Sequence, residues 1–139
     1  MKKPVLLLIM MLSVAASAFA MEVEPPEPPI PEEPYVGLIS TGGDLNISSS
    51  GIATCSGWAD LYDGYTAEVT VTLQKRVNNR WVWVDSWAGS GSSPYVSYST
   101  SSSVPSGYTY RTYVYVAVFD SSNNYIEHGE AWSGTHSYP

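Results

Sequence analysis

Apolar and polar residues alternate over much of the chain after residue 35, and the alternation is cleanest in Tyr65–Val77. A period of two with one apolar side is typical of a half-buried antiparallel strand. The residues expected to face the core from this strand are Ala67, Val69, Val71 and Leu73. The dipeptide Asn78-Asn79 follows, and because asparagine tolerates positive φ, it predicts a tight turn into a hairpin partner, Arg80–Ala88.

This hairpin partner does not continue the alternation. Trp81, Trp83 and Trp87 share the segment with valines, so bulky apolar residues occupy both parities. Either both faces of the strand are covered, or a β-bulge changes its register. The sequence leaves these two alternatives open.

Further β-patterned segments are separated by turn-forming runs such as Ser48–Gly51 and Asp63-Gly64. The longest β-patterned run is Val104–Asp120. The remaining predicted strands are Leu45–Ser48, Ile52–Leu61, Tyr95–Thr100 and Tyr125–His136, with loops at Gly89–Ser93 and Ser101–Gly107. About seven strands at this spacing, without helical periodicity, predict an all-β fold, a single antiparallel β-sandwich.

The first 20 residues have the pattern of a secretory signal peptide, so the expected location is secreted and extracellular. Two lysines precede an apolar segment, Val5–Leu12, and Ala18-Phe19-Ala20 offers the small residues that signal peptidase requires. The apolar segment is shorter than the roughly 20 residues of a membrane span. We therefore expect no membrane insertion after signal cleavage.

Residues 21–34 hold six of the ten prolines and five of the thirteen acidic residues. Proline restricts φ and like charges repel, so this segment is expected to be an extended, acidic, proline-rich linker. It would either hold the following domain, residues 35–139, away from a surface or bind a proline-recognising partner. The first of these two roles is the preferred hypothesis.

After residue 34 the chain has four basic and eight acidic residues. This balance argues against binding to nucleic acid or to an anionic membrane surface, because both need a basic surface. Cys55 is the only cysteine, so no intrachain disulfide can form. Its apolar, β-patterned surroundings favour a buried structural thiol over an intermolecular bridge.

Val104, Gly107 and Tyr110 resemble the tyrosine corner of immunoglobulin-like and fibronectin-III domains, where a loop leads into a strand with a structural tyrosine. This resemblance implies an immunoglobulin-like sandwich in which Gly107 and Tyr110 have structural roles. Structural roles are also expected for Cys55 and Trp81.

A closer resemblance covers nearly the whole domain, and rests on Leu45–Cys55, Thr72–Arg76, Trp81–Trp87 and Ser106–Arg111. These segments are similar to a family of small secreted β-sandwich proteins of unknown function from Gram-positive, clostridia-like bacteria. The resemblance implies secretion and a β-sandwich, and it brings no activity. Members of that family often have a second cysteine before the Ser-Gly turn, where this chain has Gly43.

The two C-terminal strands allow an inference about a binding face. Valines occupy one side of Val104–Asp120, and burying His128 and Glu130 beside them would be expensive. The register of opposite parity avoids this cost and sets Gly129 and Ala131 beside the valines. It gathers six residues on one outer face: Arg111, Tyr113, Tyr115, His128, Glu130 and Trp132.

We interpret this outer face as an aromatic platform on which sugar rings stack while Arg111 and Glu130 bind hydroxyl groups. The predicted function is binding or surface interaction, with a polysaccharide or a cell-surface component as partner. Cross-strand pairing on a solvent face explains the same residues. A purely structural extracellular protein without a ligand is therefore the alternative.

A hydrolase is a distant third hypothesis. No serine lies in a Gly-x-Ser-x-Gly elbow, and no glycine-rich phosphate loop is present. His128, Glu130 and His136 are poor metal ligands as a set, because two histidines eight residues apart do not meet on one strand. We therefore expect no catalytic residue, no metal and no cofactor.

Overall fold

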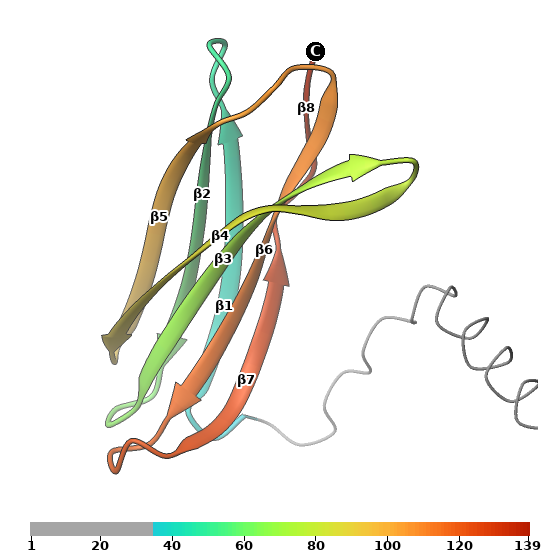
Figure 1. Cartoon of the computed structure of the whole chain (residues 1–139). Helices are drawn as coiled ribbons and strands as arrows, with labels where there is room; N and C mark the ends of the chain where they lie inside the picture. Colours follow the sequence, from blue (N-terminus) through green and yellow to red (C-terminus); the bar gives the residue numbers. More distant parts are fainter. Residues whose placement is uncertain (1–34) are drawn as a thin grey trace, which may run out of the picture. The chain divides into compact units, whose positions relative to one another are not determined.

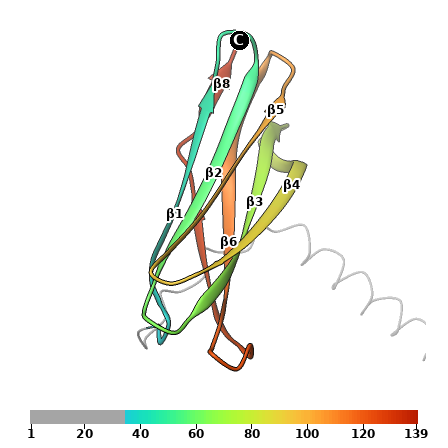
Figure 2. The same cartoon turned by 90° about the vertical axis from the view of Figure 1, so that its left-hand side faces the viewer.

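The computed structural model describes residues 35–139 and contains two antiparallel sheets packed face to face (Figure 1 and Figure 2). The three-stranded sheet has the order β1-β2-β5, with β1 (Leu38–Ile47), β2 (Ile52–Leu61) and β5 (Tyr95–Ser103). The five-stranded sheet has the order β4-β3-β6-β7, with β3 (Thr66–Val77), β4 (Arg80–Ser92), β6 (Tyr108–Phe119) and β7 (Tyr125–Trp132). A short β8 (His136–Tyr138) pairs with the start of β6.

The predicted all-β antiparallel sandwich is therefore confirmed for the described residues. The signal peptide and the linker predicted for residues 1–34 lie outside them. Within residues 35–139 there is no helix of the length and hydropathy needed to cross a membrane.

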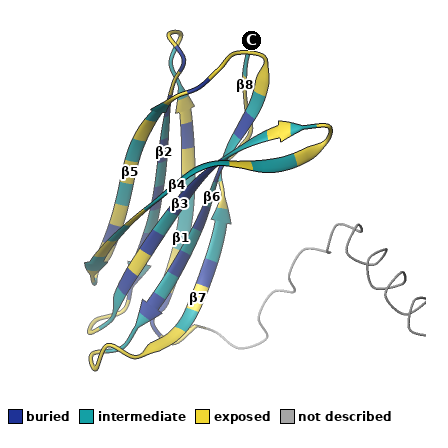
Figure 3. Cartoon of the chain, viewed as in Figure 1, coloured by how far each residue is buried: buried dark blue, intermediate teal, exposed yellow. Residues whose placement is uncertain are grey.

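Alternating burial along the strands produces the core, and bands of buried and more exposed residues alternate along β3 and β6 (Figure 3). In β3 the predicted inward residues, from Ala67 to Leu73, are buried. The predicted inward face of β2 is buried as well, and Cys55 within it has no exposed surface. Val114, Val116 and Val118 of β6 are also fully buried. These three strands follow the period-two pattern because each has one face against the opposite sheet.

Close packing between the sheets depends on glycines that face large side chains. A Cβ atom at Gly57 of β2 would lie 2.9 Å from both methyl groups of Val114, which comes from the opposite sheet. A Cβ atom at Gly43 would lie 2.7 Å from the same valine. In the other direction, Leu38 of β1 fills the space over Gly129 of β7. The two sheets therefore approach one another where one of them has no side chain.

A β-bulge explains the failed alternation in the hairpin partner of β3. Leu73 pairs with Asp85, whereas the next residue, Gln74, pairs with Trp83, so Val84 is the extra residue. The register change lets Val84 and Trp87 pack against the core while Trp83 lies on the outer face. Of the two alternatives that the sequence left open, the bulge is present.

Several predicted boundaries were wrong because strands continue through small polar residues. β1 begins at Leu38 and not at Leu45, and it pairs with β2 through Thr41-Gly42-Gly43. β4 continues to Ser92 through the segment predicted as the loop Gly89–Ser93. β5 likewise extends to Ser103. Glycine and serine indicate loops in a sequence, but here a neighbouring strand supplies the hydrogen bonds that keep the backbone extended.

The last predicted strand, Tyr125–His136, is interrupted in the structure. β7 ends at Trp132, and β8 begins at His136. At the break, the Ser133 amide donates to the Thr112 carbonyl, and the Thr112 amide donates to the Ser133 hydroxyl at 2.8 Å. The Ser133 side-chain oxygen thus takes the place of a backbone carbonyl as the acceptor for the Thr112 amide of β6 at the break between β7 and β8.

Turn residues adopt the conformations that their types favour. Asn78 and Asn79 have φ values of 53° and 62°, which confirms the predicted tight turn. Gly107 has a φ of 93°, in the region that favours glycine. Shortly after it, the fully buried Tyr110 donates its hydroxyl hydrogen to the Pro105 carbonyl at 2.6 Å. This is the hydrogen bond of a tyrosine corner.

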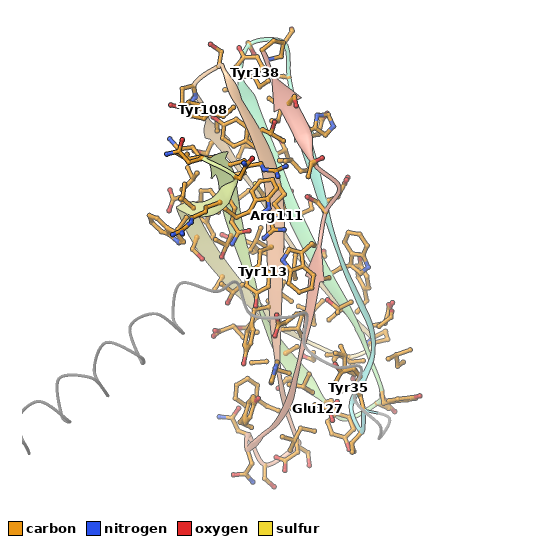
Figure 4. All side chains as sticks on the ribbon, turned by 90° about the vertical axis from the view of Figure 1, so that its right-hand side faces the viewer. Tyr35, Tyr108, Arg111, Tyr113, Glu127 and Tyr138 are labelled. Atoms are coloured by element: carbon orange, nitrogen blue, oxygen red, sulfur yellow. The ribbon has the colours of Figure 1, made fainter. Side chains whose placement is uncertain are left out.

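Glu127 joins the start of β1 to β7, and Figure 4 shows it at the same end of the sandwich as Tyr35. Its two carboxylate oxygens accept hydrogen bonds from the backbone amides of Val36, Gly37 and Leu38 at 2.8–3.0 Å. Hydrogen bonds to an ionised acceptor are stronger than neutral ones. Glu127 thereby anchors the first residues of the domain to the opposite sheet.

We predict that Gly57→Ala destabilises the domain by about 1–3 kcal/mol, because the added methyl group must displace Val114 in a closely packed core. Thermal unfolding followed by calorimetry measures this change. Gly134→Ala is the matched control, since a Cβ atom there meets nothing within 4 Å. Equal melting temperatures for the two variants would contradict close packing between the sheets.

We predict that Thr112→Val raises the free energy of unfolding by about 1 kcal/mol, because the fully buried Thr112 hydroxyl forms no well-aligned hydrogen bond and has only the weakly hydrogen-bonding Cys55 thiol beside it. Thr72→Val is the matched control. The Thr72 hydroxyl bonds the Ser86 hydroxyl at 2.9 Å, so its loss should lower stability by about 0.5–1.5 kcal/mol. Denaturant titration of both variants measures the change in the free energy of unfolding. A change of the same sign in both would contradict the different hydrogen bonding of the two hydroxyl groups.

Candidate functional site

The six residues predicted to share an outer face lie together on β6 and β7. Tyr113 is opposite Trp132 and Tyr115 is opposite Glu130, while Ala117 is opposite His128. On the inner side Val114 and Val116 pair with Ala131 and Gly129. The predicted register is therefore confirmed. We call the outer side of β4, β3, β6 and β7 the aromatic face.

Ring contacts organise the centre of the aromatic face. The rings of Tyr113 and Trp132 are 5.4 Å apart with their planes at 37°. Tyr115 and His128 are stacked, with centroids 5.1 Å apart and planes at 15°. Tyr113 and Tyr115 are half-buried by these contacts, whereas Trp132 keeps 44 % of its surface exposed. The tryptophan is thus the ring of this pair that a ligand can reach.

Arg111 is held in a fixed position on this face, above Tyr113 in Figure 4. Its Nε donates to the side-chain oxygen of Gln74 at 2.7 Å, and its guanidinium lies 4.3 Å from the centre of the Trp81 ring. Trp81 belongs to β4, which is separated from β6 by β3. Beyond the bulge the β3–β4 hairpin crosses in front of β6 (Figure 1), which brings this tryptophan over Arg111.

Trp81 therefore lies outside the core and acts on the aromatic face. It is half-buried, and the guanidinium of Arg76 lies 5.9 Å from its ring, so two arginines contact it. Cation–π contacts of this kind contribute about 0.5–1 kcal/mol each at exposed sites. Trp81 thus contacts Arg111 directly and helps to orient its guanidinium.

Trp83 is a further member of the aromatic face that the sequence did not identify. It is 65 % exposed and pairs with Gln74, which on its other side pairs with Arg111. The three side chains form one row across β4, β3 and β6. The sequence could not predict which side of the sheet Trp83 lies on, because this depends on the bulge at Val84 and the residue pattern does not show the bulge.

Glu130 and His128 form a polar cluster at the β7 side of the face. The His128 Nε2 atom lies 3.7 Å from a Glu130 oxygen, and its Nδ1 atom is 3.0 Å from the Tyr125 hydroxyl. Burial, followed by a hydrogen bond to Glu130 and the charge of that carboxylate, raises the pKa of Tyr113 well above its usual range. Burial and then a hydrogen bond to Tyr125 raise the pKa of Tyr115. Both tyrosines are therefore neutral hydrogen-bonding groups at neutral pH.

The aromatic face offers groups for stacking and for hydrogen bonding. Residues 35–139 contain no group of three or more His, Cys, Asp or Glu residues arranged to hold a metal ion. His136 of β8 pairs with Tyr110 near the start of β6, whereas His128 of β7 pairs with Ala117 near its end. Burial raises the pKa of the Cys55 thiol, and the Thr112 hydroxyl opposes this rise by less. A buried thiol of raised pKa is a poor nucleophile.

Comparisons with protein-family models, with curated proteins and with solved structures find no match to this chain. The resemblance to secreted clostridial proteins therefore stays a prediction.

We predict that stability falls as the pH rises above about 10, the pKa of an unfolded tyrosine. Tyr113 has a raised pKa when folded, so above that pH the unfolded chain loses a proton that the folded domain retains. Tyr113→Phe should reduce this slope by up to about 1.4 kcal/mol per pH unit. Denaturant titrations at several alkaline pH values measure the slope.

Trp132→Phe is the control for this measurement, because it alters the contact with Tyr113 but removes no ionisable group. It should keep the wild-type slope. A Tyr113→Phe variant with an unchanged slope would refute the raised pKa of Tyr113 in the folded domain.

Proposed function

We propose that this protein is a secreted, non-catalytic binding domain that takes up polysaccharide on its aromatic face. The observation that carries the proposal is the pair of exposed indoles on that face, Trp132 at 44 % and Trp83 at 65 % exposure. Indole rings bury large apolar area with little loss of conformational entropy, and they stack on the apolar faces of sugar rings.

Polar groups lie beside the two tryptophans and suit a hydroxyl-rich ligand. Arg111 is held by Gln74 and Trp81, so little rotamer entropy is lost when it donates to a ligand. Glu130 contacts His128 and Tyr113 and offers carboxylate oxygens as acceptors. Donor and acceptor thus flank the rings, which is the arrangement that recognises both the faces and the hydroxyl groups of a sugar.

The extracellular setting is supported by the sequence of the first 20 residues, which has the features of a signal peptide. Outside the cell, insoluble glycans are abundant partners for a small domain. The competing proposal is a structural protein in which the same rings only stabilise the sheet, at about 0.2–1 kcal/mol per cross-strand pair. The two proposals differ in whether a ligand is retained.

We predict that the purified wild-type protein is retained on an insoluble polysaccharide, cellulose or chitin, or on purified cell walls. The double variant Tyr113→Ala, Trp132→Ala should be retained at least about fivefold less, because two stacking rings contribute about 1–3 kcal/mol together. Co-sedimentation with each polysaccharide measures retention, and circular dichroism verifies that the variant remains folded.

Tyr62→Ala is the matched control, because Tyr62 is 51 % exposed and follows β2, away from the aromatic face. It should be retained like the wild type. A folded double variant with wild-type retention, or a wild type that none of these materials retains, would favour the structural protein.

A further inference from the structure

The outer side of the three-stranded sheet carries two large rings, Trp58 of β2 and Tyr95 of β5, among mostly small polar residues. Figure 2 shows β1, β2 and β5 of this sheet side by side. Trp58 of β2 points outward, because its neighbours Gly57 and Ala59 are buried on the inner side. Its direct cross-strand neighbours are Gly42 of β1 and Ser97 of β5. Neither neighbour has a side chain large enough to cover an indole.

The indole of Trp58 lies over the backbone of Gly42. A Cβ atom built at Gly42 would collide with Cζ2 of the indole and would lie 3.0 Å from its Cη2. The benzene ring of the indole thus occupies the space that a side chain at residue 42 would fill. One side of the ring is against the β1 backbone, which leaves Trp58 half-buried with its other side available.

The surroundings of the ring are flat and rich in hydroxyl groups. Ser56 and Ser99 bond one another at 3.0 Å across β2 and β5, and Thr54 and Ser101 do so at 3.1 Å. These side chains are short and hold each other near the sheet. Toward Ser99, a long ligand can therefore lie along the strands without meeting a large side chain beside Trp58. Toward Asp60, it meets the exposed ring of Tyr95, which pairs with Asp60.

Acidic residues flank the ring at both ends. Asp60 follows Trp58 by two residues on the same side of β2, roughly 7 Å along the strand. Asp44 follows Gly42 by two residues on β1, which runs the opposite way, so it lies beyond the other end of the ring. The Ser40 hydroxyl donates to one oxygen of Asp60 at 2.6 Å, which fixes that carboxylate.

The charge on this face selects against anionic ligands. In residues 35–139 every lysine and arginine lies on β3, β4 or β6: Lys75, Arg76, Arg80 and Arg111. The three-stranded sheet therefore has carboxylates and no cationic side chain to balance them. Carboxylates accept hydrogen bonds from sugar hydroxyls and pair with amino groups, and they repel uronic acids, sulfates and phosphates.

We propose that Trp58 is the centre of a second glycan-binding site, which takes a pyranose polymer free of negative charge. A sugar ring stacks on the outer side of the indole, and Asp44 and Asp60 accept hydrogen bonds from its neighbours along the chain. This site faces away from the aromatic face on the opposite sheet, so one domain can bridge two glycan chains. Only the bridging rests on the proposed function; the Trp58 site stands on its own observations.

A purely structural role of Trp58 makes a different prediction. Aromatic rings that cover a cross-strand glycine stabilise sheets without any ligand. If this were the whole role, Trp58→Ala would lower the melting temperature and leave ligand binding unchanged. The test must therefore measure binding on variants that remain folded, and it must include one that keeps the indole but moves it.

Isothermal titration calorimetry with cellohexaose and with a glucosamine hexamer provides the test. Trp58→Ala should weaken binding at this site at least tenfold for each hexamer that binds, and Trp58→Phe should retain part of the affinity. Gly42→Ser keeps the indole but forces it off the β1 backbone, so it should lose affinity as well. Circular dichroism establishes that each variant is folded, and Gly134→Ser is the control for adding a side chain at a glycine.

The two hexamers distinguish neutral from amine-bearing polymers. Equal affinities indicate recognition through hydroxyl groups, and tighter, salt-sensitive binding of the glucosamine hexamer indicates pairing with Asp44 and Asp60; both results support the site. Binding of neither hexamer, tighter binding of an oligogalacturonate, or wild-type affinity in folded Trp58→Ala and Gly42→Ser variants overturns it.

The double variant Tyr113→Ala, Trp132→Ala separates this proposal from the proposed function. If both sites exist, the wild type binds two hexamers per domain, and each set of variants binds one. Loss of binding only in the Trp58 variants supports the second site and contradicts the aromatic face. Loss of binding only in the double variant supports the aromatic face and contradicts the second site.

Discussion

The close approach of two sheets across glycines is the constraint on which the remaining structure depends. Val114 of β6 fits over Gly43 and Gly57, and Leu38 of β1 fits over Gly129. Each fit requires a backbone with no side chain on one sheet and a branched side chain on the other. A slip of one residue in β2 would bring Ser56 or Trp58 to the position where Gly57 is needed, and a slip of one residue in β6 would turn its valines to solvent. The register is therefore specified by shape as well as by hydrophobicity.

This constraint also determines the outer surfaces, because successive side chains of a strand point to opposite faces, and fixing the inward residues fixes which residues point outward. Once Gly129 and Ala131 lie beside the valines of β6, Glu130 and Trp132 must lie outside, next to Tyr115 and Tyr113. The packing of the core thus places aromatic and charged residues of β6 and β7 together on the outer side of the sheet. The same reasoning holds on the other sheet, where the inward direction of Gly57 and Ala59 turns Trp58 outward.

Sequence alone predicted the parts of this fold in which one residue pattern determines one structure. β3, β2 and β6 have an apolar face and a polar face, and their burial follows that pattern. The candidate face was predictable because charged residues in β7 left only one acceptable register. β1 was missed in its first half, because Thr41-Gly42-Gly43 is extended only through pairing with β2. Trp83 was missed because the extra residue of the bulge, Val84, changes the face of the sheet on which Trp83 lies.

The position of Trp58 was unpredictable for a related reason. It is the only aromatic residue of β2, between Ser56 and Asp60 on the outer side, and nothing in its own segment shows that a glycine lies across from it. The pairing of Gly42 with Trp58 follows from the register of β1, which in turn depends on Gly43 meeting Val114 from the opposite sheet. A contact inside the sandwich therefore decides how a ring lies on its outside. Glycines that look like strand breakers in this chain are, in the folded domain, the positions that admit large side chains to the core on one side of β1 and a flat indole on the other.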